Sequence, residues 1–232
     1  MEIDKNISEL MEIVVGDGCL NRYRSKNRTD YKLMISGGHE ETDFFENLKI
    51  KLDSVFNHKS KIKKEEDGLV LVLNSKKCVE YFESLGIPVG KKGKNIRVPP
   101  FIIKDNSLSP SFIRGLCDTD FCVSFKKGGR KNNSYPRISW SSISKNLVTD
   151  VFNILTSMGI KSFMYKREME TNFKKDHIIY CLDINGNKNL ELWMEKIGFN
   201  NKKHLSKIEV WRELGYCPPH TTYKERLKIL EQ

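Results

Sequence analysis

The sequence predicts an α+β protein made of two αββαββα repeats, related by pseudo-twofold symmetry and each forming an antiparallel sheet. Three observations predict this fold. A short apolar segment that ends in an acid occurs twice, at residues 10–18 and 113–121. The same order of predicted elements follows both copies: two strands, a helix, two strands and a helix. Later parts of the halves also align, since residues 73–74 match residues 184–185. Such an internal duplication implies pseudo-twofold symmetry.

Each element of the first half has its own signal. Ser8 is a capping residue for the first acid-ended helix. Residues 22–35 begin as a polar, basic run and end as a strand, which indicates a hairpin with a long basic tip. Residues 40–56 place apolar side chains at helical spacing and predict an amphipathic helix. The remaining elements are strands at 60–64 and 69–73 and a helix at 76–85 that stops at Gly86.

The second half repeats these signals. Ser109 and Pro110 are typical of a helix start, and the second acid-ended helix follows them. The later elements are strands at 122–126 and 137–141 around a basic tip at 126–131, a helix at 145–158, strands at 161–167 and 177–184, and a helix at 187–197. Two further helices, at 202–214 and 221–230, have no counterpart in the first half.

The repeats set the expected domain boundaries. Residues 1–87 are the first repeat, and residues 111–232 are the second repeat with the extra C-terminal helices. Residues 88–110 are rich in glycine, proline and lysine, so we expect a linker with loop structure.

Composition narrows the class of partner. The chain of 232 residues carries a formal net charge of +10, and a basic protein attracts polyanions such as nucleic acids. Its six cysteines show no paired spacing, which is typical of reduced thiols in a cytosolic protein. We find neither a signal peptide nor a membrane-spanning segment. The expected location is therefore cytoplasmic, with no membrane partner.

Asp17 and Asp120 lie at the C-terminal ends of the two acid-ended helices. A carboxylate at that pole is disfavoured by about 0.3–1 kcal/mol unless a cation compensates it. Two such ends therefore indicate a divalent metal or a basic surround. Close crossing of the helices needs small side chains, which Gly16, Gly115 and Thr119 supply.

Both segments resemble the LAGLIDADG motif of homing endonucleases. The resemblance is strongest over residues 112–125, FIRGLCDTDFCVSF, which are similar to the second motif of monomeric, two-motif members of the archaeal or organellar kind. It implies sheets that form a DNA-binding saddle. It also implies a site-specific endonuclease, active in intron homing, that hydrolyses both strands of a long DNA site across the minor groove and leaves short 3′ overhangs.

The resemblance also implies the catalytic groups. Asp17 and Asp120 are the expected metal-binding pair, with Gly16 and Thr119 beside them in the metal site. The expected metal is Mg²⁺, with Mn²⁺ as a substitute and Ca²⁺ supporting binding without cutting. We expect a lysine to assist in each half, namely Lys92 and Lys203.

Two residues depart from the motif. Glu12 stands where the family usually has a small residue. Phe121 replaces the final glycine of the second motif, where the chain often has positive φ, so we expect a different turn there.

DNA contacts are expected from the strands and hairpin tips, whose arginines and lysines can read guanine edges or bind phosphates. The candidates are Arg22, Arg24, Lys26, Arg28, Lys32, Lys61 and Lys63 in the first half and Lys126, Arg130, Arg137, Lys166 and Arg167 in the second.

Other functions remain open at this point. A relative impaired in cleavage would act as a DNA-binding protein or as a maturase that binds intron RNA, and Glu12 and Phe121 favour this alternative. A basic scaffold explains the charge but not the duplicated acids. An intein is not expected, because the chain opens with Met1 and ends with Glu231 and Gln232.

Overall fold

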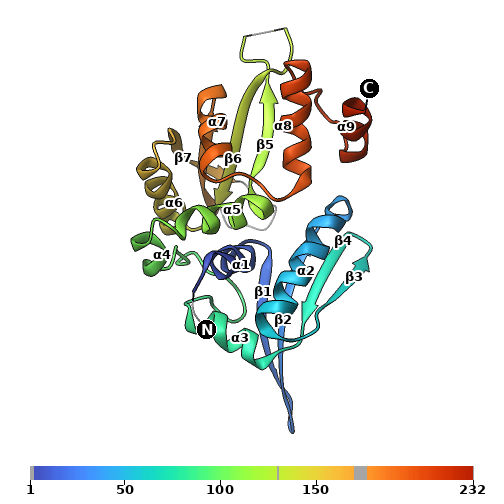
Figure 1. Ribbon diagram of the computed structural model, residues 1–232. Coiled ribbons are helices and arrows are strands. Elements are labelled where there is room, and N and C mark those ends of the chain that lie inside the picture. The colour runs from blue at the N-terminus through green and yellow to red at the C-terminus, as the bar shows by residue number, and fades with distance from the viewer. Residues whose placement is uncertain (1–2, 130, 170–176, 232) are drawn as a thin grey trace. The chain divides into compact units, whose positions relative to one another are not determined.

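The computed structural model describes residues 3–129, 131–169 and 177–231. The chain divides into two compact units, Met1–Thr119 and Asp120–Gln232 (Figure 1). All but the last residue of the second motif helix therefore belongs to the first unit.

The first unit contains one four-stranded antiparallel sheet with helices on one face. Its elements are α1 (Lys5–Gly16), β1 (Gly18–Arg24), β2 (Thr29–Gly37), η1 (His39–Glu41), α2 (Thr42–Phe56), β3 (Lys61–Glu65), β4 (Gly68–Leu73), α3 (Lys76–Ser84), α4 (Pro100–Lys104) and α5 (Ser109–Asp120). The strand order is β1-β2-β4-β3. This matches the predicted order of elements in the first repeat.

Register decides which side chains of the first sheet face the helices. Leu33 of β2 pairs with Leu20 of β1 and with Leu73 of β4, and all three are buried. Because side chains alternate along a strand, their neighbours Asn21 and Lys32 point to the opposite face. We call that opposite face the outer face of the sheet.

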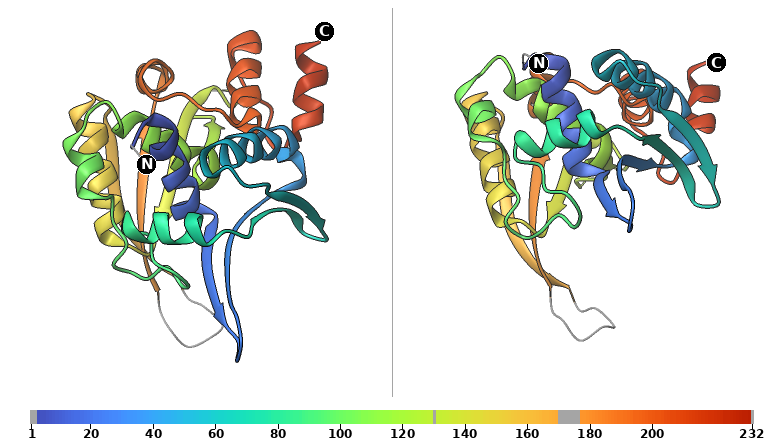
Figure 2. Two further views of the ribbon diagram at one scale, coloured as in Figure 1. Left: turned by 60° about the horizontal axis from the view of Figure 1, so that its bottom comes forward. Right: turned by 90° about the horizontal axis from the view of Figure 1, so that it is seen from below.

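The hairpin of β1 and β2 differs from its prediction. Its strands run from Gly18 to Arg24 and from Thr29 to Gly37, so most of the basic run is paired strand. Figure 2 shows this hairpin as a long blue ribbon that extends beyond the other strands of its sheet. The tip is a short turn in which the Ser25 amide donates to the Arg28 carbonyl at 2.8 Å.

The start of α1 also differs from its prediction. Asp4 is the N-cap, because its carboxylate accepts from the Ile7 amide at 2.8 Å. Ser8 lies inside the helix, and its hydroxyl donates to the Leu108 carbonyl at 3.0 Å. Ser109 is likewise the first residue of its helix, and its hydroxyl donates to the Ile102 carbonyl at 2.7 Å.

The segment at residues 88–110 contains ordered structure where a loop was expected. Pro100 lies in the first turn of α4, a position that suits the fixed φ of proline. Val98 and Ile102 are fully buried. Earlier in the segment, Val89 forms a parallel bridge with Leu20, and the Gly90 amide donates to the Leu20 carbonyl at 2.7 Å.

The second unit repeats the sheet and adds two helices. Its elements are β5 (Cys122–Lys126), β6 (Tyr135–Ser142), α6 (Lys145–Ser157), β7 (Ser162–Met169), β8 (His177–Asn185), α7 (Asn187–Lys196), α8 (Lys202–Leu214) and α9 (Tyr223–Leu230). The strand order is β5-β6-β8-β7, which is the order of the first sheet. The predicted fold class is thus confirmed: α+β, with two antiparallel sheets of equal topology.

The two C-terminal helices make their contacts with residues of the second unit. Helix α8 lies beside β5 (Figure 1), where Trp211 stacks on Phe125 with ring centroids 5.5 Å apart. Arg226 of α9 is buried, and its Nε donates to the Ser206 hydroxyl at 2.9 Å. Among the described residues, no helix combines the length and apolarity that crossing a membrane requires.

Candidate active site and nucleic-acid interface

The backbones of α1 and α5 come very close at Gly115. A Cβ placed on Gly115 would lie 2.4 Å from the Glu9 carbonyl oxygen and 3.3 Å from the Glu12 Cβ. Glycine is therefore required at this crossing. Glu12, which departs from the family pattern, is fully buried beside it.

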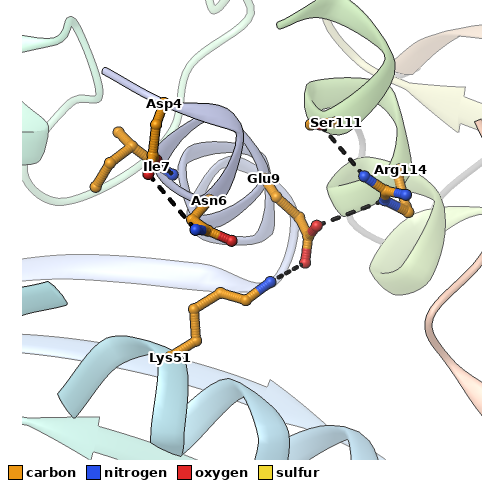
Figure 3. A network of polar contacts seen from close by, with 7 residues as sticks. All are labelled: Asp4, Asn6, Ile7, Glu9, Lys51, Ser111 and Arg114. Atoms are coloured by element: carbon orange, nitrogen blue, oxygen red, sulfur yellow. Dashed lines mark hydrogen bonds and ion pairs between the residues drawn. The ribbon is translucent and has the colours of Figure 1, made fainter. Parts of the chain in front are cut away.

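A buried carboxylate ties three helices together next to this crossing (Figure 3). Glu9 of α1 accepts from Lys51 Nζ of α2 at 2.6 Å and lies 3.5 Å from Arg114 Nε of α5. The Arg114 Nη2 atom also donates to the Ser111 hydroxyl at 3.2 Å. The close-up shows the carboxylate of Glu9 between the two cations. In the first unit, the two motif helices are thus joined by a buried carboxylate whose negative charge is balanced by two cations.

Asp17 follows the last residue of α1, and its amide donates to the Ile13 carbonyl at 3.1 Å. Lys92 lies at the same helix end. Its ammonium donates to the carbonyls of Val14, at 3.2 Å, Val15 and Gly16. A cation at this pole offsets the partial negative charge of the helix end, where Asp17 adds a full one. The Gly16 carbonyl, expected in the metal site, accepts from Lys92 in this structure.

Gly18, the last residue of the first motif, is required for packing. Its Cβ would lie 2.5 Å from the Val14 Cα, so a larger residue would clash with the last turn of α1. Its φ is not positive. The conformational reason expected for a motif glycine therefore does not apply.

Phe121 occupies the equivalent place in the second motif without the expected strain. Among the described non-glycine residues, positive φ occurs at Asn57 and His220. Helix α5 continues through Asp120, whereas α1 stops before Asp17, so the chain leaves the second helix one residue later. Phe121 is 3% exposed and stacks on Trp140 with ring centroids 5.1 Å apart. It is a core residue of the second unit.

Asp120 lines a polar hollow on the outer face of the second sheet. The hollow has a volume of about 330 Å³, and its walls include Arg137, Tyr165, Arg167 and Asp183. Thr119 precedes Asp120, and its hydroxyl donates to the carbonyls of Gly115 and Leu116 within α5. In this conformation the Thr119 hydroxyl is engaged in its own helix.

Lys203, the lysine expected to assist the second half, lies in the first turn of α8. Its amide donates to the Asn201 side chain at 3.1 Å, a helix-capping contact. Lys207, one turn later, reaches the strand that follows Asp120. Its Nζ donates to the Val123 carbonyl at 3.0 Å. Burial lowers the pKa of the Lys207 ammonium from its usual value.

Sequence reasoning did not select Lys207, and the sequence alone carries no signal for it. Val123 is the third residue after Asp120, and Leu20 is the third residue after Asp17. The Leu20 carbonyl accepts from the Gly90 amide, so both halves supply a donor at this position. A search of the second half for that donor requires the fold, because Gly90 and Lys207 do not align.

The basic candidates of the first unit lie on different faces. Lys61 and Lys63 pair with Val72 and Val70 on the outer face, which also holds Lys32. Arg22 lies on the helix-covered face, where it forms an ion pair with Glu83 and lies over the Tyr31 ring at 5.4 Å. Alternation places Arg24 on the same face as Arg22. Lys26 lies at the exposed hairpin tip, as does Arg28, which pairs with Asp30.

The basic candidates of the second unit divide in the same way. Lys126, Arg137 and Arg167 lie on the outer face, by their register with Tyr135, Ser124 and Ile179. Lys166 is exposed but points to the face that carries α6. Arg130 lies outside the described residues.

The outer face of β7 carries two aromatic residues that were not among the predicted site residues. Phe163 is 66% exposed, and its ring lies 6.1 Å from that of Tyr165. Asp183 of β8 pairs with Phe163 in register and holds the Arg137 guanidinium. The alternation of Phe163, Tyr165 and Arg167 in the sequence is the signal that could have revealed this face.

The predicted metal, Mg²⁺, does not require a cluster of protein ligands. No cluster of three or more His, Cys, Asp or Glu side chains occurs among the residues that the structure describes. Mg²⁺ is commonly bound through one or two carboxylates, with waters and substrate phosphates completing the shell. Asp17 and Asp120 each stay a predicted ligand for a metal bound in that way.

The fold and the candidate site define a class of protein with two repeats: in each, an acid stands at the end of the motif helix, and a four-stranded sheet follows along the chain. Residues 108–198 match the LAGLIDADG-like domain family. This match supports the resemblance that the motifs predict, and the chain has the fold of LAGLIDADG homing endonucleases.

Two solved structures illustrate this fold. I-DmoI in complex with DNA and Mn is 20% identical, with a TM-score of 0.59 over 84% of this chain and 97% of that chain. Other I-DmoI structures are described in complex with DNA and Ca, or with target DNA in the presence of Mg. I-GzeII in complex with its DNA target is 11% identical, with a TM-score of 0.57 over 99% and 98% of the two chains.

Two curated relatives come from Methanocaldococcus jannaschii. The replication factor C small subunit is 26% identical over 208 residues, which are 89% of this chain and 10% of the relative. Glutamine–fructose-6-phosphate aminotransferase is 27% identical over 207 residues, which are 87% of this chain and 17% of the relative. This chain thus spans less than a fifth of each relative, and their names share no activity.

Proposed function

We propose that the chain is a site-specific, double-stranded DNA endonuclease that hydrolyses phosphodiester bonds with the help of a divalent metal. The observation that carries this proposal is the acid at the end of each motif helix, immediately before the first strand of a sheet with a basic outer face. Two such acids suit a duplex substrate, because each acid can serve the cleavage of one of the two strands. The printed descriptions of I-DmoI and I-GzeII as DNA complexes support the same substrate.

Asp17 and Asp120 are the proposed metal-binding acids, with Gly16 and Thr119 beside them. A divalent ion such as Mg²⁺, held by these residues, would supply water activation and stabilisation of the leaving oxygen. Lys92 binds the last carbonyls of α1 and offsets the negative charge at the helix end where Asp17 follows. Lys203 stays a prediction, and Lys207 is a second candidate for the corresponding role in the second half.

The outer faces of the sheets are the proposed DNA-binding surfaces. Lys32, Lys61 and Lys63 in the first unit and Lys126, Arg137 and Arg167 in the second are placed to contact a groove or its phosphates. Arg22, with its partner Glu83, is instead a packing residue of the helix-covered face. We further propose that the protein acts as a monomer, that it cuts across the minor groove to leave short 3′ overhangs, and that it serves intron homing.

The test is selection of duplexes from a randomised DNA library with Ca²⁺ present, followed by addition of Mg²⁺ and sequencing of the ends. The proposal expects sharp ends with a constant short 3′ overhang. Asp17→Asn and Asp120→Asn should retain binding and lose double-strand cutting. Asp67→Asn, an exposed acid in the turn between β3 and β4, is the matched control and should cut normally. Equal cutting by either motif variant would refute the assignment of the acids.

The alternative function is binding without cutting, as a DNA-binding protein or an RNA-splicing maturase. The buried Glu12 and the core residue Phe121 favour it, because both depart from the motif next to the proposed site. A selected DNA consensus that Mg²⁺ never cleaves would establish DNA binding alone. Selection of structured RNA in place of duplex DNA would establish the maturase.

A further inference from the structure

The second unit contains a pocket between strand β5, helix α8 and the segment that joins α8 to α9. Its walls are residues 122–125, Lys207 and residues 217–221, and its volume is about 250 Å³. Pockets that hold drug-sized ligands have volumes of about 300–1,000 Å³. This pocket therefore suits a smaller molecule, such as a single sugar.

Lys207 supplies an amine to this pocket. Its side chain is half-buried, and its Nζ donates to the Val123 carbonyl at 3.0 Å. Among the described residues that line the pocket, none carries a carboxylate. The amine thus lies in a partly apolar wall without a negative charge beside it in that wall.

A second cation lies next to the pocket. Arg226 of α9 is 2% exposed, and its Nη1 atom donates to the carbonyl of Thr221, a wall residue. Burial, together with the positive charge of Arg226, lowers the pKa of the Lys207 ammonium. The sulfur atoms of Cys122 and Cys217 oppose this shift without reversing it. Desolvation and a neighbouring cation are the two conditions that turn a lysine into a nucleophile for carbonyl groups.

His220 also lines the pocket, and its backbone is strained. Its φ is 60°, and the other described non-glycine residue with a positive φ is Asn57. Asn57 ends helix α2, where such a conformation is common. His220 lies between two helices and caps neither of them. Residues held in this conformation cluster at functional sites, and an imidazole there can act as a general base.

The pocket adjoins the hollow that Asp120 lines, because Cys122 belongs to the walls of both. Under the proposed function, Asp120 serves a phosphodiester at that hollow, so the nucleotides beside that bond are the parts of DNA nearest to Lys207. The sugar of an intact nucleotide has no carbonyl group. The sugar of an abasic nucleotide opens to an aldehyde, which an amine can attack.

Resting on the proposed function for its DNA substrate, we propose that Lys207 is the nucleophile of a second, metal-independent activity, the cleavage of DNA at abasic nucleotides. The Lys207 Nζ adds to the aldehyde carbon of the opened sugar, and the aldehyde oxygen leaves as water, which forms an imine. His220 takes a proton from the carbon next to the imine. The bond from the following carbon to the 3′ phosphate oxygen then breaks and leaves a 5′ phosphate on the departing strand. Water hydrolyses the imine, which restores the lysine and releases an unsaturated aldehyde.

Borohydride trapping tests this activity directly. The substrate is a duplex with one abasic site, made by enzymatic excision of uracil and incubated with the natural chain in EDTA. EDTA removes the divalent metal on which the proposed endonuclease depends, so cleavage at the abasic site is a separate readout. Sodium borohydride reduces the imine to a stable amine, and mass spectrometry should locate the adduct on Lys207. A tetrahydrofuran analogue of the abasic site, which cannot open to an aldehyde, should give no adduct.

Three variants assign the roles. Lys207→Arg keeps a cation that can donate to the Val123 carbonyl, but a guanidinium does not form the imine, so adduct and cleavage should be lost. Binding of an intact duplex and the unfolding temperature show whether this variant is folded. Lys202→Arg, at an exposed lysine of the same helix, is the matched control and should keep both adduct and cleavage. His220→Asn tolerates the positive φ, so it should still form the adduct but should cleave about 100-fold more slowly.

The outcomes distinguish this inference from the proposed function. An adduct on another lysine, or equal trapping by a folded Lys207→Arg variant, overturns the assignment of the nucleophile. Trapping of free 2-deoxyribose 5-phosphate without trapping of abasic DNA overturns the DNA substrate. If the chain binds abasic duplex and forms no adduct, the second activity is overturned and the endonuclease proposal stands. If the adduct forms on Lys207 and no duplex is cut in Mg²⁺, the second activity stands and the endonuclease proposal fails.

Discussion

The backbone of Gly115 approaches the carbonyl of Glu9 so closely that a Cβ at residue 115 would lie 2.4 Å from that oxygen. The obstacle is backbone, which cannot rotate away as a side chain can. The crossing of α1 and α5 thus depends on one missing methyl group.

Gly115→Ala should destabilise the first unit by about 1–3 kcal/mol, because the helices must move apart to admit the methyl group. Denaturant unfolding measures this change. Gly93→Ala is the matched control, since a Cβ at Gly93 meets nothing within 4 Å and its φ is not positive. Equal stability of both variants would contradict the close crossing.

Lys92→Gln should lower stability by about 0.3–2 kcal/mol, because the C-terminal carbonyls of α1 lose their cation. It should reduce cutting more than DNA binding, since the position of Asp17 depends on that helix end. Single-turnover cleavage at saturating protein separates the two effects. Lys91→Gln removes an exposed neighbouring lysine and should change neither. If both variants lost stability and cutting to the same extent, the effect would come from the net positive charge of the protein and not from the contact of Lys92 with the end of α1.

Phe121→Gly restores the motif glycine, yet we expect it to damage the protein. Removal of a buried phenylalanine side chain costs about 3–5 kcal/mol, and Phe121 stacks on Trp140 in the core. The free energy of unfolding checks this. Phe163→Ala, a truncation of an exposed phenylalanine, should be near neutral in stability. A stabilised Phe121→Gly variant would show that the turn, and not the core, governs this position.

Lys63→Gln should weaken DNA binding about equally for all sequences and reduce the salt slope by about 1, as expected for a lysine that contacts phosphate. Fluorescence anisotropy at several salt concentrations measures the slope. Lys166→Gln, on the helix-covered face of the second sheet, is the control and should leave the slope unchanged. If Lys166→Gln lowered the salt slope and Lys63→Gln did not, the assignment of the outer faces to DNA would be wrong.

Alkaline pH should destabilise the first unit through Cys78. Burial raises the pKa of this thiol from 9.0 to about 12. The folded state therefore keeps a proton that the unfolded state loses above 9.0, so stability is full below that pH and falls as pH rises. The slope should approach about 1.4 kcal/mol per pH unit between the two values. Cys78→Ala should remove this contribution to the slope, whereas Cys122→Ala, at an exposed thiol, should not.

The order of elements could be predicted because it depends on periodicity and on duplication. The ends of β5 and α8 fall where the sequence puts them. The β1–β2 hairpin was predicted too short, because its outer part pairs without burying a face and so lacks alternating apolar residues. Helix α4 was missed because its prolines suggested a loop, although proline suits the first turn.

Only part of the candidate site could be predicted from the sequence, because sequence shows the residue types but not the face of the sheet on which each one lies. Positions of acids and lysines can be read from the chain, but the face of a strand follows from its register. Arg22 and Lys32 look alike in sequence, yet they lie on opposite faces because Leu20 and Leu33 anchor the sheet. The partner of Arg137 is Asp183, which is 46 residues away, so neither could be assigned before the sheet order was known.

The donors to Leu20 and Val123 each occupy a backbone carbonyl at the edge of a sheet. Both carbonyls belong to β1 and β5, the outermost strands on one side of their sheets, and an open outer strand can recruit a strand of another molecule. A backbone amide occupies one carbonyl of this edge in the first sheet, and a lysine ammonium occupies the corresponding carbonyl in the second. The two repeats therefore use different chemistry at the same position: a side-chain substitution at Lys207 removes the contact in the second sheet, whereas the donor in the first sheet is a backbone amide.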